Sequence, residues 1–236
     1  MAKKNKFETN AIHIGNKPDA STGSVSPPIN LTSTFAQDGI GKNKGFDYSR
    51  GTNPTRERLE KNIASLEGGY DAIAFSSGMA ATTALFQSLK QGDHVIISRN
   101  VYGGTYRMAT QILSNHGLKF DFVNTTNIQN IKDAIKPETK WIFIETPTNP
   151  GVEVIDLEMI ARVGKKNNVL TNVDNCFATP YAQKPAEFGI DIVTHSATKY
   201  IDGQGRVLGG LILGPKEYID EVVTFCRSTG PTISPF

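Results

Sequence analysis

Short apolar runs alternate along most of the chain with segments whose apolar residues recur every three or four positions. The first pattern predicts β-strands and the second predicts amphipathic helices. Strands are expected at 72–75, 94–98, 119–123, 141–145, 169–173, 190–194 and 208–213. Helices are expected at 79–89, 105–115, 128–135, 157–166 and 216–226. This alternation favours an α/β fold, in which a mostly parallel seven-stranded sheet lies between helices.

Residues 1–55 do not follow this pattern, because no helical or strand period is sustained there. A long irregular segment is unusual inside a compact domain, so we expect an N-terminal arm that wraps a neighbouring subunit or lines a site. Asn53 and Pro54 at its end are typical of a helix start, and the glycine pair at 68–69 is expected to end that helix. The sequence thus divides into an arm (1–55) and a large domain (56–236).

Composition and charge exclude several classes of protein. A net charge of +2 over 236 residues gives no reason to expect nucleic acid or a membrane as a partner. The chain has no run of 18 apolar residues and no leader-like start, so we expect a soluble cytoplasmic protein. Cys176 and Cys226 lack metal-ligand spacing, and the four histidines share none, so reduced thiols and no metal site are expected.

Lys199 stands after a predicted strand, among small residues and before a glycine-rich loop at 203–210. A lysine packed in this way can lose its proton more readily than a solvated one, and the free amine forms a Schiff base with a carbonyl. Taken alone, a loop lysine is more often simply solvated. The neighbouring strand ends therefore decide between the two interpretations.

Four other polar segments follow predicted strands, at the edge where open α/β sheets bind ligands. Ser77, Gly78 and Met79 begin a helix whose free N–H groups suit a phosphate, although an ordinary strand-to-helix turn would look the same. Tyr102 precedes two glycines that leave room for a flat ring, on which its side chain could stack or to which it could transfer a proton. A core tyrosine is the alternative.

Asp174 ends another apolar run, and a buried carboxylate needs a cationic or hydrogen-bonding partner such as a protonated pyridine nitrogen. A capping role is the alternative. Asn149 lies in a proline-rich turn at 145–151 that could hold its amide against a ring oxygen, or could be a turn and nothing more. We interpret His195 as packed against the sheet rather than catalytic.

Together these residues supply what pyridoxal phosphate demands of a protein, namely a lysine for its aldehyde, an acid for its ring nitrogen, a phosphate cradle and a flat side chain. They are Lys199, Asp174, Ser77 to Met79 with Ser196 and Thr198, and Tyr102.

Several short motifs also carry a family resemblance: Tyr48-Ser49-Arg50, Asn53-Pro54-Thr55, Ser77-Gly78-Met79, Tyr102-Gly103, Val173-Asp174-Asn175 and Ser196-Ala197-Thr198-Lys199-Tyr200. With these motifs the chain resembles the cystathionine γ-synthase family, the Cys/Met-metabolism group of fold type I pyridoxal phosphate enzymes, from about residue 7 to its last residue. The resemblance implies a smaller C-terminal domain beyond residue 236, with the arginine for the substrate carboxylate, so we expect this chain to be a fragment or a truncated product.

The resemblance also implies a role for each matching residue. Lys199 would bind the cofactor aldehyde and move protons between substrate carbons, and Asp174 would keep the ring nitrogen protonated. The other implied contacts are Tyr102 on the ring face, Asn149 at the ring hydroxyl, and Ser77, Gly78, Met79, Ser196 and Thr198 around the phosphate. Tyr48 and Arg50 would reach the phosphate of a neighbouring subunit, so a homodimer, usually paired into a tetramer, is expected.

Within the family, the segments 203–210 and 227–236 most resemble O-succinylhomoserine sulfhydrylases. The implied reaction is a γ-replacement on an O-acylhomoserine in methionine biosynthesis, in which sulfide replaces the acyl group to give homocysteine. A cystathionine or methionine γ-lyase is an alternative. Methionine γ-lyases resemble one another in having a cysteine close to this tyrosine, whereas this chain has Gly103 and Gly104 there, which weighs against a lyase. A third alternative is a catalytically inactive module that only binds the cofactor.

Overall fold

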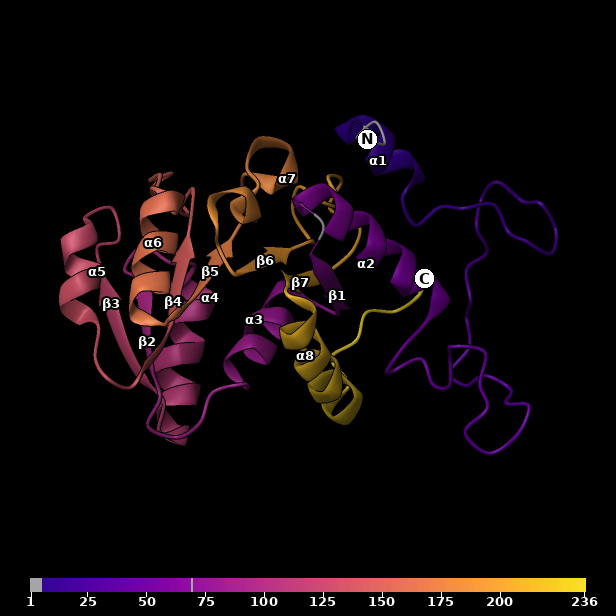
Figure 1. The fold of residues 1–236 in the computed structure, drawn as a ribbon, viewed down its shortest axis with the longest axis horizontal. Helices are drawn as coiled ribbons and strands as arrows, with labels where there is room; N and C mark the ends of the chain where they lie inside the picture. Colours follow the sequence, from indigo (N-terminus) through magenta and orange to yellow (C-terminus); the bar gives the residue numbers. More distant parts are fainter. Residues whose placement is uncertain (1–5, 69) are drawn as a thin grey trace.

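The computed structural model describes residues 6–68 and 70–236, which build a seven-stranded sheet with helices on both faces (Figure 1). The strands are β1 (Asp71–Phe75), β2 (His94–Ser98), β3 (Lys119–Val123), β4 (Thr139–Glu145), β5 (Leu170–Asp174), β6 (Ile192–Ser196) and β7 (Gly210–Gly214). Their order across the sheet is β1-β7-β6-β5-β4-β2-β3. β7 runs in the opposite direction to the other six strands, which are parallel to one another, so the predicted α/β class and mostly parallel sheet are confirmed.

Six of the eight α-helices in the described residues lie close to predicted positions, and α1 and α7 were not predicted. They are α1 (Phe7–His13), α2 (Pro54–Glu67), α3 (Gly78–Phe86), α4 (Gly103–Arg107), α5 (Ile128–Ala134), α6 (Leu157–Asn167), α7 (Thr179–Ala182) and α8 (Lys216–Thr229). The single helix expected at 105–115 is wrong in detail, because α4 continues as a π-helical turn at Met108–Ile112 and a 3₁₀ turn at Leu113–His116.

Alternating residues of β4 show how the sheet is covered on both faces. Trp141 and Phe143 pack into one apolar cluster with residues of α3 and α8. Ile142 and Ile144 point to the other face and pack with residues of α5 and α6. A strand buried on both faces reads as a continuous apolar run, and this is why its position could be predicted from the sequence.

The N-terminal arm lies beside the sheet and extends to one side of the molecule (Figure 1). The sequence interpretation missed α1, whose seven residues dock on α2 because the Asn62 amide donates to the carbonyls of Asn10 and Ile14 at 3.1 and 2.9 Å. Asn53 caps α2 as expected, since its side chain accepts from the Thr55 N–H at 2.9 Å. Position 69 of the glycine pair lies outside the described residues, and the division of the chain at residue 55 stays a prediction.

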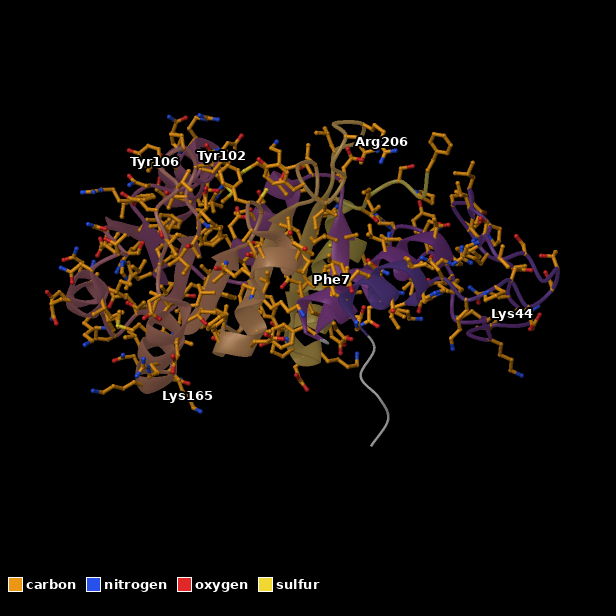
Figure 2. All side chains as sticks on the ribbon, turned by 90° about the horizontal axis from the view of Figure 1, so that it is seen from above. Phe7, Lys44, Tyr102, Tyr106, Lys165 and Arg206 are labelled. Carbon is orange, nitrogen blue, oxygen red and sulfur yellow. The ribbon has the colours of Figure 1, made fainter. Side chains whose placement is uncertain are left out.

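The topology brings the carboxyl ends of β1 to β6 to one edge of the sheet, because these strands are parallel to one another. In Figure 2, Tyr102 and Arg206 lie toward the same side of the molecule. Tyr102 follows β2, and Arg206 lies in the loop before β7. Lys165, near the end of α6, lies toward the opposite side. The polar segments predicted to carry chemistry therefore share one edge.

Candidate functional site

A cavity opens at the carboxyl edge of the sheet. Nine of the eleven predicted site residues line it: Ser77, Gly78, Met79, Tyr102, Asn149, Asp174, Ser196, Thr198 and Lys199. Tyr48 and Arg50 do not line this cavity. They lie together in the arm, where the Arg50 guanidinium carbon stands 5.2 Å from the centre of the Tyr48 ring and both side chains are exposed.

Lys199 is placed by the tight turn that follows β6. Its own N–H donates to the Ser196 carbonyl at 3.3 Å, and its carbonyl accepts from the Gly203 N–H at 2.8 Å. The Thr198 hydroxyl accepts from the Gly209 N–H at 3.0 Å and lies 3.2 Å from the Gly209 carbonyl, so it ties the glycine-rich loop to the turn. These hydrogen bonds fix the backbone at Lys199, whose side chain is exposed to the cavity.

The start of α3 forms a cradle for an anion. The Ser77 hydroxyl accepts from the Ala80 N–H at 3.1 Å and so caps the helix, while the N–H groups of Gly78 and Met79 have no acceptor within the helix. A Cβ at position 78 would lie 2.7 Å from the Cβ of Ser196, so only glycine lets the helix start approach β6 so closely. Backbone N–H groups at the positive end of a helix dipole bind phosphate well.

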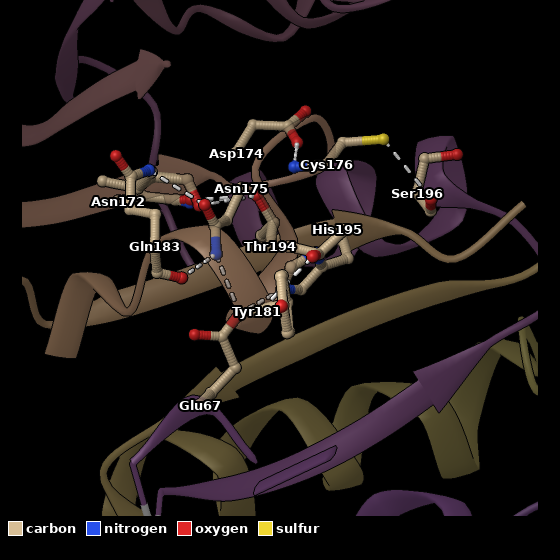
Figure 3. Close-up of polar contacts among 12 residues, drawn as sticks. Glu67, Asn172, Asp174, Asn175, Cys176, Tyr181, Gln183, Thr194, His195 and Ser196 are labelled. Atoms are coloured by element: carbon tan, nitrogen blue, oxygen red, sulfur yellow. Dashed lines mark hydrogen bonds and ion pairs between the residues drawn. The ribbon is translucent and has the colours of Figure 1, made fainter. Parts of the chain in front are cut away.

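Asp174 ends β5 with a carboxylate whose Oδ1 accepts from the Cys176 N–H at 3.1 Å (Figure 3). Burial raises the pKa of this carboxyl, so the site favours a cation beside it. Cys176 is a free thiol, and burial, followed by the charge of Asp174, raises its pKa to about 12. Cys176 is half-buried, and its sulfur lies 3.4 Å from the Ser196 carbonyl.

Glu145 is a site residue that sequence reasoning missed. It ends β4, and only 6% of the residue is exposed. Its Oε2 accepts from the Tyr102 N–H at 2.7 Å, and its Oε1 accepts from the Asn149 N–H at 2.8 Å. Burial and the charge of Asp174 raise its pKa to about 7. An acid at the end of a buried apolar run was the available signal, but its partners could not be read from the sequence.

His195 is buried and paired, as the sequence interpretation expected of a packed histidine. Its Nε2 lies 2.5 Å from Oε1 of Glu67, whose side chain is also fully buried (Figure 3). The Asn175 amide donates to the same carboxylate oxygen at 3.0 Å. This contact joins α2 to the strand that precedes Lys199, and His195 also borders the cavity.

The cavity fits pyridoxal phosphate by the chemistry of its donors, since it combines an amine, a buried acid, an exposed aromatic ring and the cradle closed around Gly78. In the part of the chain that the structure describes, no three His, Cys, Asp or Glu side chains are grouped so that they could hold a metal ion. None of the helices seen in residues 6–68 and 70–236 is long and apolar enough to cross a membrane.

Residues 8–236 match the profile of a protein family described as Cys/Met metabolism PLP-dependent enzyme. The chain belongs to this family. Its members depend on pyridoxal phosphate (PLP), and the resemblance drawn from the short motifs is confirmed.

Three curated relatives show how the family varies. The chain is 44% identical to a probable cystathionine γ-synthase of Herpetosiphon aurantiacus, over 98% of its own length and 72% of that protein. It is 45% identical to a cystathionine β-lyase of Lactococcus lactis subsp. cremoris (strain MG1363), over 97% and 60% of the two chains. It is 46% identical to a cystathionine γ-lyase of Bacillus subtilis (strain 168), over 98% and 61%.

Solved structures agree with the fold. A cystathionine γ-lyase from Lactobacillus plantarum, complexed with L-serine, superposes with a TM-score of 0.95 at 41% identity. The metB protein from Corynebacterium glutamicum superposes with a TM-score of 0.96, also at 41% identity. Each match covers 98% of this chain and 61% of the other. The fold type I architecture is therefore confirmed, and the chain spans about three fifths of the length of both solved relatives.

Proposed function

We propose that the protein to which this chain belongs catalyses a PLP-dependent γ-replacement, in which sulfide displaces the acyl group of an O-acylhomoserine. O-succinylhomoserine is the expected substrate, and the product is homocysteine for methionine biosynthesis. The observation that carries the proposal is the single cavity lined by Lys199, Asp174 and Tyr102 at the carboxyl edge of the sheet. The expected cytoplasmic location is part of the same proposal.

When bound, PLP supplies an aldehyde that joins an amine and a ring that withdraws electrons from a neighbouring carbanion. Lys199 binds that aldehyde and then serves as the base in the cavity. Asp174 accepts a hydrogen bond from the ring nitrogen and keeps it protonated, which suits a buried carboxylate that favours a cationic partner. Tyr102 stacks on the ring, and Asn149 contacts the ring hydroxyl.

The phosphate lies at the start of α3 in this proposal. The N–H groups of Gly78 and Met79 donate to it, together with the hydroxyls of Ser77, Ser196 and Thr198. The close approach of Gly78 to Ser196 supports this assignment, because it brings a helix start and a strand end together around one small volume.

The reaction breaks the bond between the γ carbon and the acyl oxygen, and it forms a bond between the γ carbon and sulfur. Succinate leaves, and sulfide enters. One proton must first be removed from the α carbon and one from the β carbon, and both sites must be protonated again before the product leaves. A single base that can reach both carbons is required, and Lys199 is exposed to the cavity on a flexible stem.

Elimination is the second candidate, and the similarity to proteins named cystathionine γ-lyase supports it. The similarity to a probable cystathionine γ-synthase supports replacement. To distinguish them, the 236-residue chain is incubated with PLP, O-succinylhomoserine and sulfide, and homocysteine and 2-oxobutyrate are measured. Homocysteine as the main product is expected. An excess of 2-oxobutyrate would overturn replacement in favour of elimination, and bound PLP without either product would leave the chain as a cofactor-binding module.

Shared active sites complete the proposal. Tyr48 and Arg50 are exposed in the arm and lie outside the cavity of their own chain, and a guanidinium fork binds phosphate oxygens in pairs. They would therefore complete the phosphate site of a neighbouring copy in a homo-oligomer. Mixing the Arg50→Ala and Lys199→Ala variants should restore activity that each lacks alone, because a mixed dimer contains one intact site. No recovery on mixing would contradict the shared site.

A further inference from the structure

Glu145 connects two chain segments that the proposed function places around the cofactor ring. Tyr102 follows β2, and Asn149 follows β4, so the two residues approach the cavity from different strands. The Glu145 carboxylate accepts one backbone N–H from each, at 2.7 and 2.8 Å. One buried side chain thus bridges both segments.

The bridge uses the whole carboxylate. Oε1 takes the Asn149 N–H and Oε2 takes the Tyr102 N–H, so each oxygen accepts one backbone hydrogen bond. An oxygen occupied by a backbone donor is not free to turn into the cavity toward a substrate. The geometry therefore fits a residue that positions others rather than one that exchanges protons with the substrate.

Tyr102 depends on such an anchor, because 45% of it is exposed and burial does little to fix its position. The ring rests on Gly104, where an added Cβ would meet the ring carbon Cε1 at 2.4 Å and the sulfur of Met79 at 3.0 Å. With the ring packed this closely on the backbone that follows it, a displacement of the Tyr102 backbone displaces the ring as well.

We propose that Glu145 is a positioning residue of the cofactor site, whose carboxylate fixes the spacing between the Tyr102 ring and the Asn149 amide before the cofactor binds. The inference rests on the placement of PLP in this cavity under the proposed function. It is independent of which substrate reacts. A preformed site binds its ligand more tightly because less ordering remains to be done on binding.

Glu145→Gln is the main test, because the amide of glutamine presents one acceptor and one donor where the carboxylate presents two acceptors. One of the two backbone N–H groups then loses its acceptor and faces a donor. Glu145→Asp is the second variant, since it keeps both oxygens on a stem one carbon shorter. Glu158→Gln on α6 is the matched control, because it removes a carboxylate that is 67% exposed and pairs only with Arg162, at 3.9 Å.

Two measurements are made on the 236-residue chain. The dissociation constant of PLP is obtained by titration, from the quenching of the single tryptophan, Trp141. Circular dichroism of the visible cofactor band is then recorded at saturating PLP, because it reports how the ring is held rather than whether the chain is folded. Glu145→Gln should raise the dissociation constant about tenfold and lower the visible signal, in line with the loss of one buried hydrogen bond. Glu145→Asp should lie between, and Glu158→Gln should match the wild type.

The inference is overturned if Glu145→Gln keeps the wild-type dissociation constant and the wild-type visible signal. If that variant does not fold, the same two readings on Glu145→Asp decide, and wild-type values for it overturn the inference. Failure of the proposed function gives a different result. If the wild type itself shows no visible cofactor band that depends on Lys199, PLP is not held by that residue, and then both the proposed function and this inference fail.

Discussion

Glu145 and Asp174 are register partners on the neighbouring parallel strands β4 and β5. Both carboxyl groups stand at the ends of their strands and border the same cavity. Burial raises the pKa of each, and the charge of Asp174 raises the pKa of Glu145 further, to about 7. A cation beside Asp174 would relieve this repulsion, and a protonated ring nitrogen is such a cation. Four other titratable side chains line the cavity: Tyr102, Cys176, His195 and Lys199.

The raised pKa of Glu145 predicts how stability depends on pH without cofactor. Between its ordinary value of 4.5 and about 7, the folded state binds more protons at Glu145 than the unfolded state. The contribution of Glu145 to the free energy of unfolding is therefore present at low pH. It is lost as the pH rises from 4.5 to about 7, by about 3 kcal/mol in all.

Glu145→Gln removes this dependence. Urea unfolding at about pH 5 and about pH 7.5 should show the wild type losing more stability than the variant between the two conditions. If the difference in unfolding free energy between the wild type and Glu145→Gln is the same at both pH values, the pKa of Glu145 is not raised.

The buried contact between Glu67 and His195 predicts a large loss of stability on truncation. Glu67→Ala leaves the His195 imidazole and the Asn175 amide without their shared acceptor inside the protein. Breaking a fully buried polar pair in this way costs about 3–5 kcal/mol. Glu67→Gln keeps an acceptor oxygen and should lose less. Urea unfolding measures both, with Glu158→Ala as an exposed control, and a cost for Glu67→Ala below about 1 kcal/mol would refute the prediction.

The close approach at Gly78 predicts that a methyl group there damages the phosphate cradle. Gly78→Ala places a Cβ within 3.0 Å of the Cα and Cβ of Ser196, which are not free to swing away. Overpacking of this kind costs about 1–3 kcal/mol and should also weaken PLP binding. Gly39→Ala is the control, since its Cβ would meet only the Lys42 side chain, at 3.5 Å. Equal PLP affinities for the two variants would show that the cradle does not bind the phosphate.

Local chemistry explains the parts of the fold that the sequence predicts well. β2 has the predicted bounds because all five of its residues are buried and the apolar run ends sharply. The start of α2 is predicted because Asn53 and Pro54 act through neighbouring backbone atoms. β6 ends two residues later than expected, at Ser196, because its pairing with β7 continues that far, and this register depends on the fold.

Contacts between distant segments explain what the sequence could not predict. Glu145 lies 43 positions from Tyr102, and no local pattern announces that the two will bond. The docking of α1 likewise depends on Asn62, about 50 positions away. Lys199, Asp174 and Tyr102 could be named in advance because each stands at the end of a strand or in the turn after it, and the carboxyl ends of parallel strands meet at one edge. The roles of these site residues stay predictions.

The proposed function requires that the amine of Lys199 hold PLP as a Schiff base. Reduction of the PLP-loaded chain with borohydride, followed by peptide mapping, makes that linkage permanent and locates it. We expect the label on the peptide containing Lys199 and no label at that position in Lys199→Ala. A label on any other lysine, or an unmodified Lys199 in a chain that has bound PLP, would contradict it.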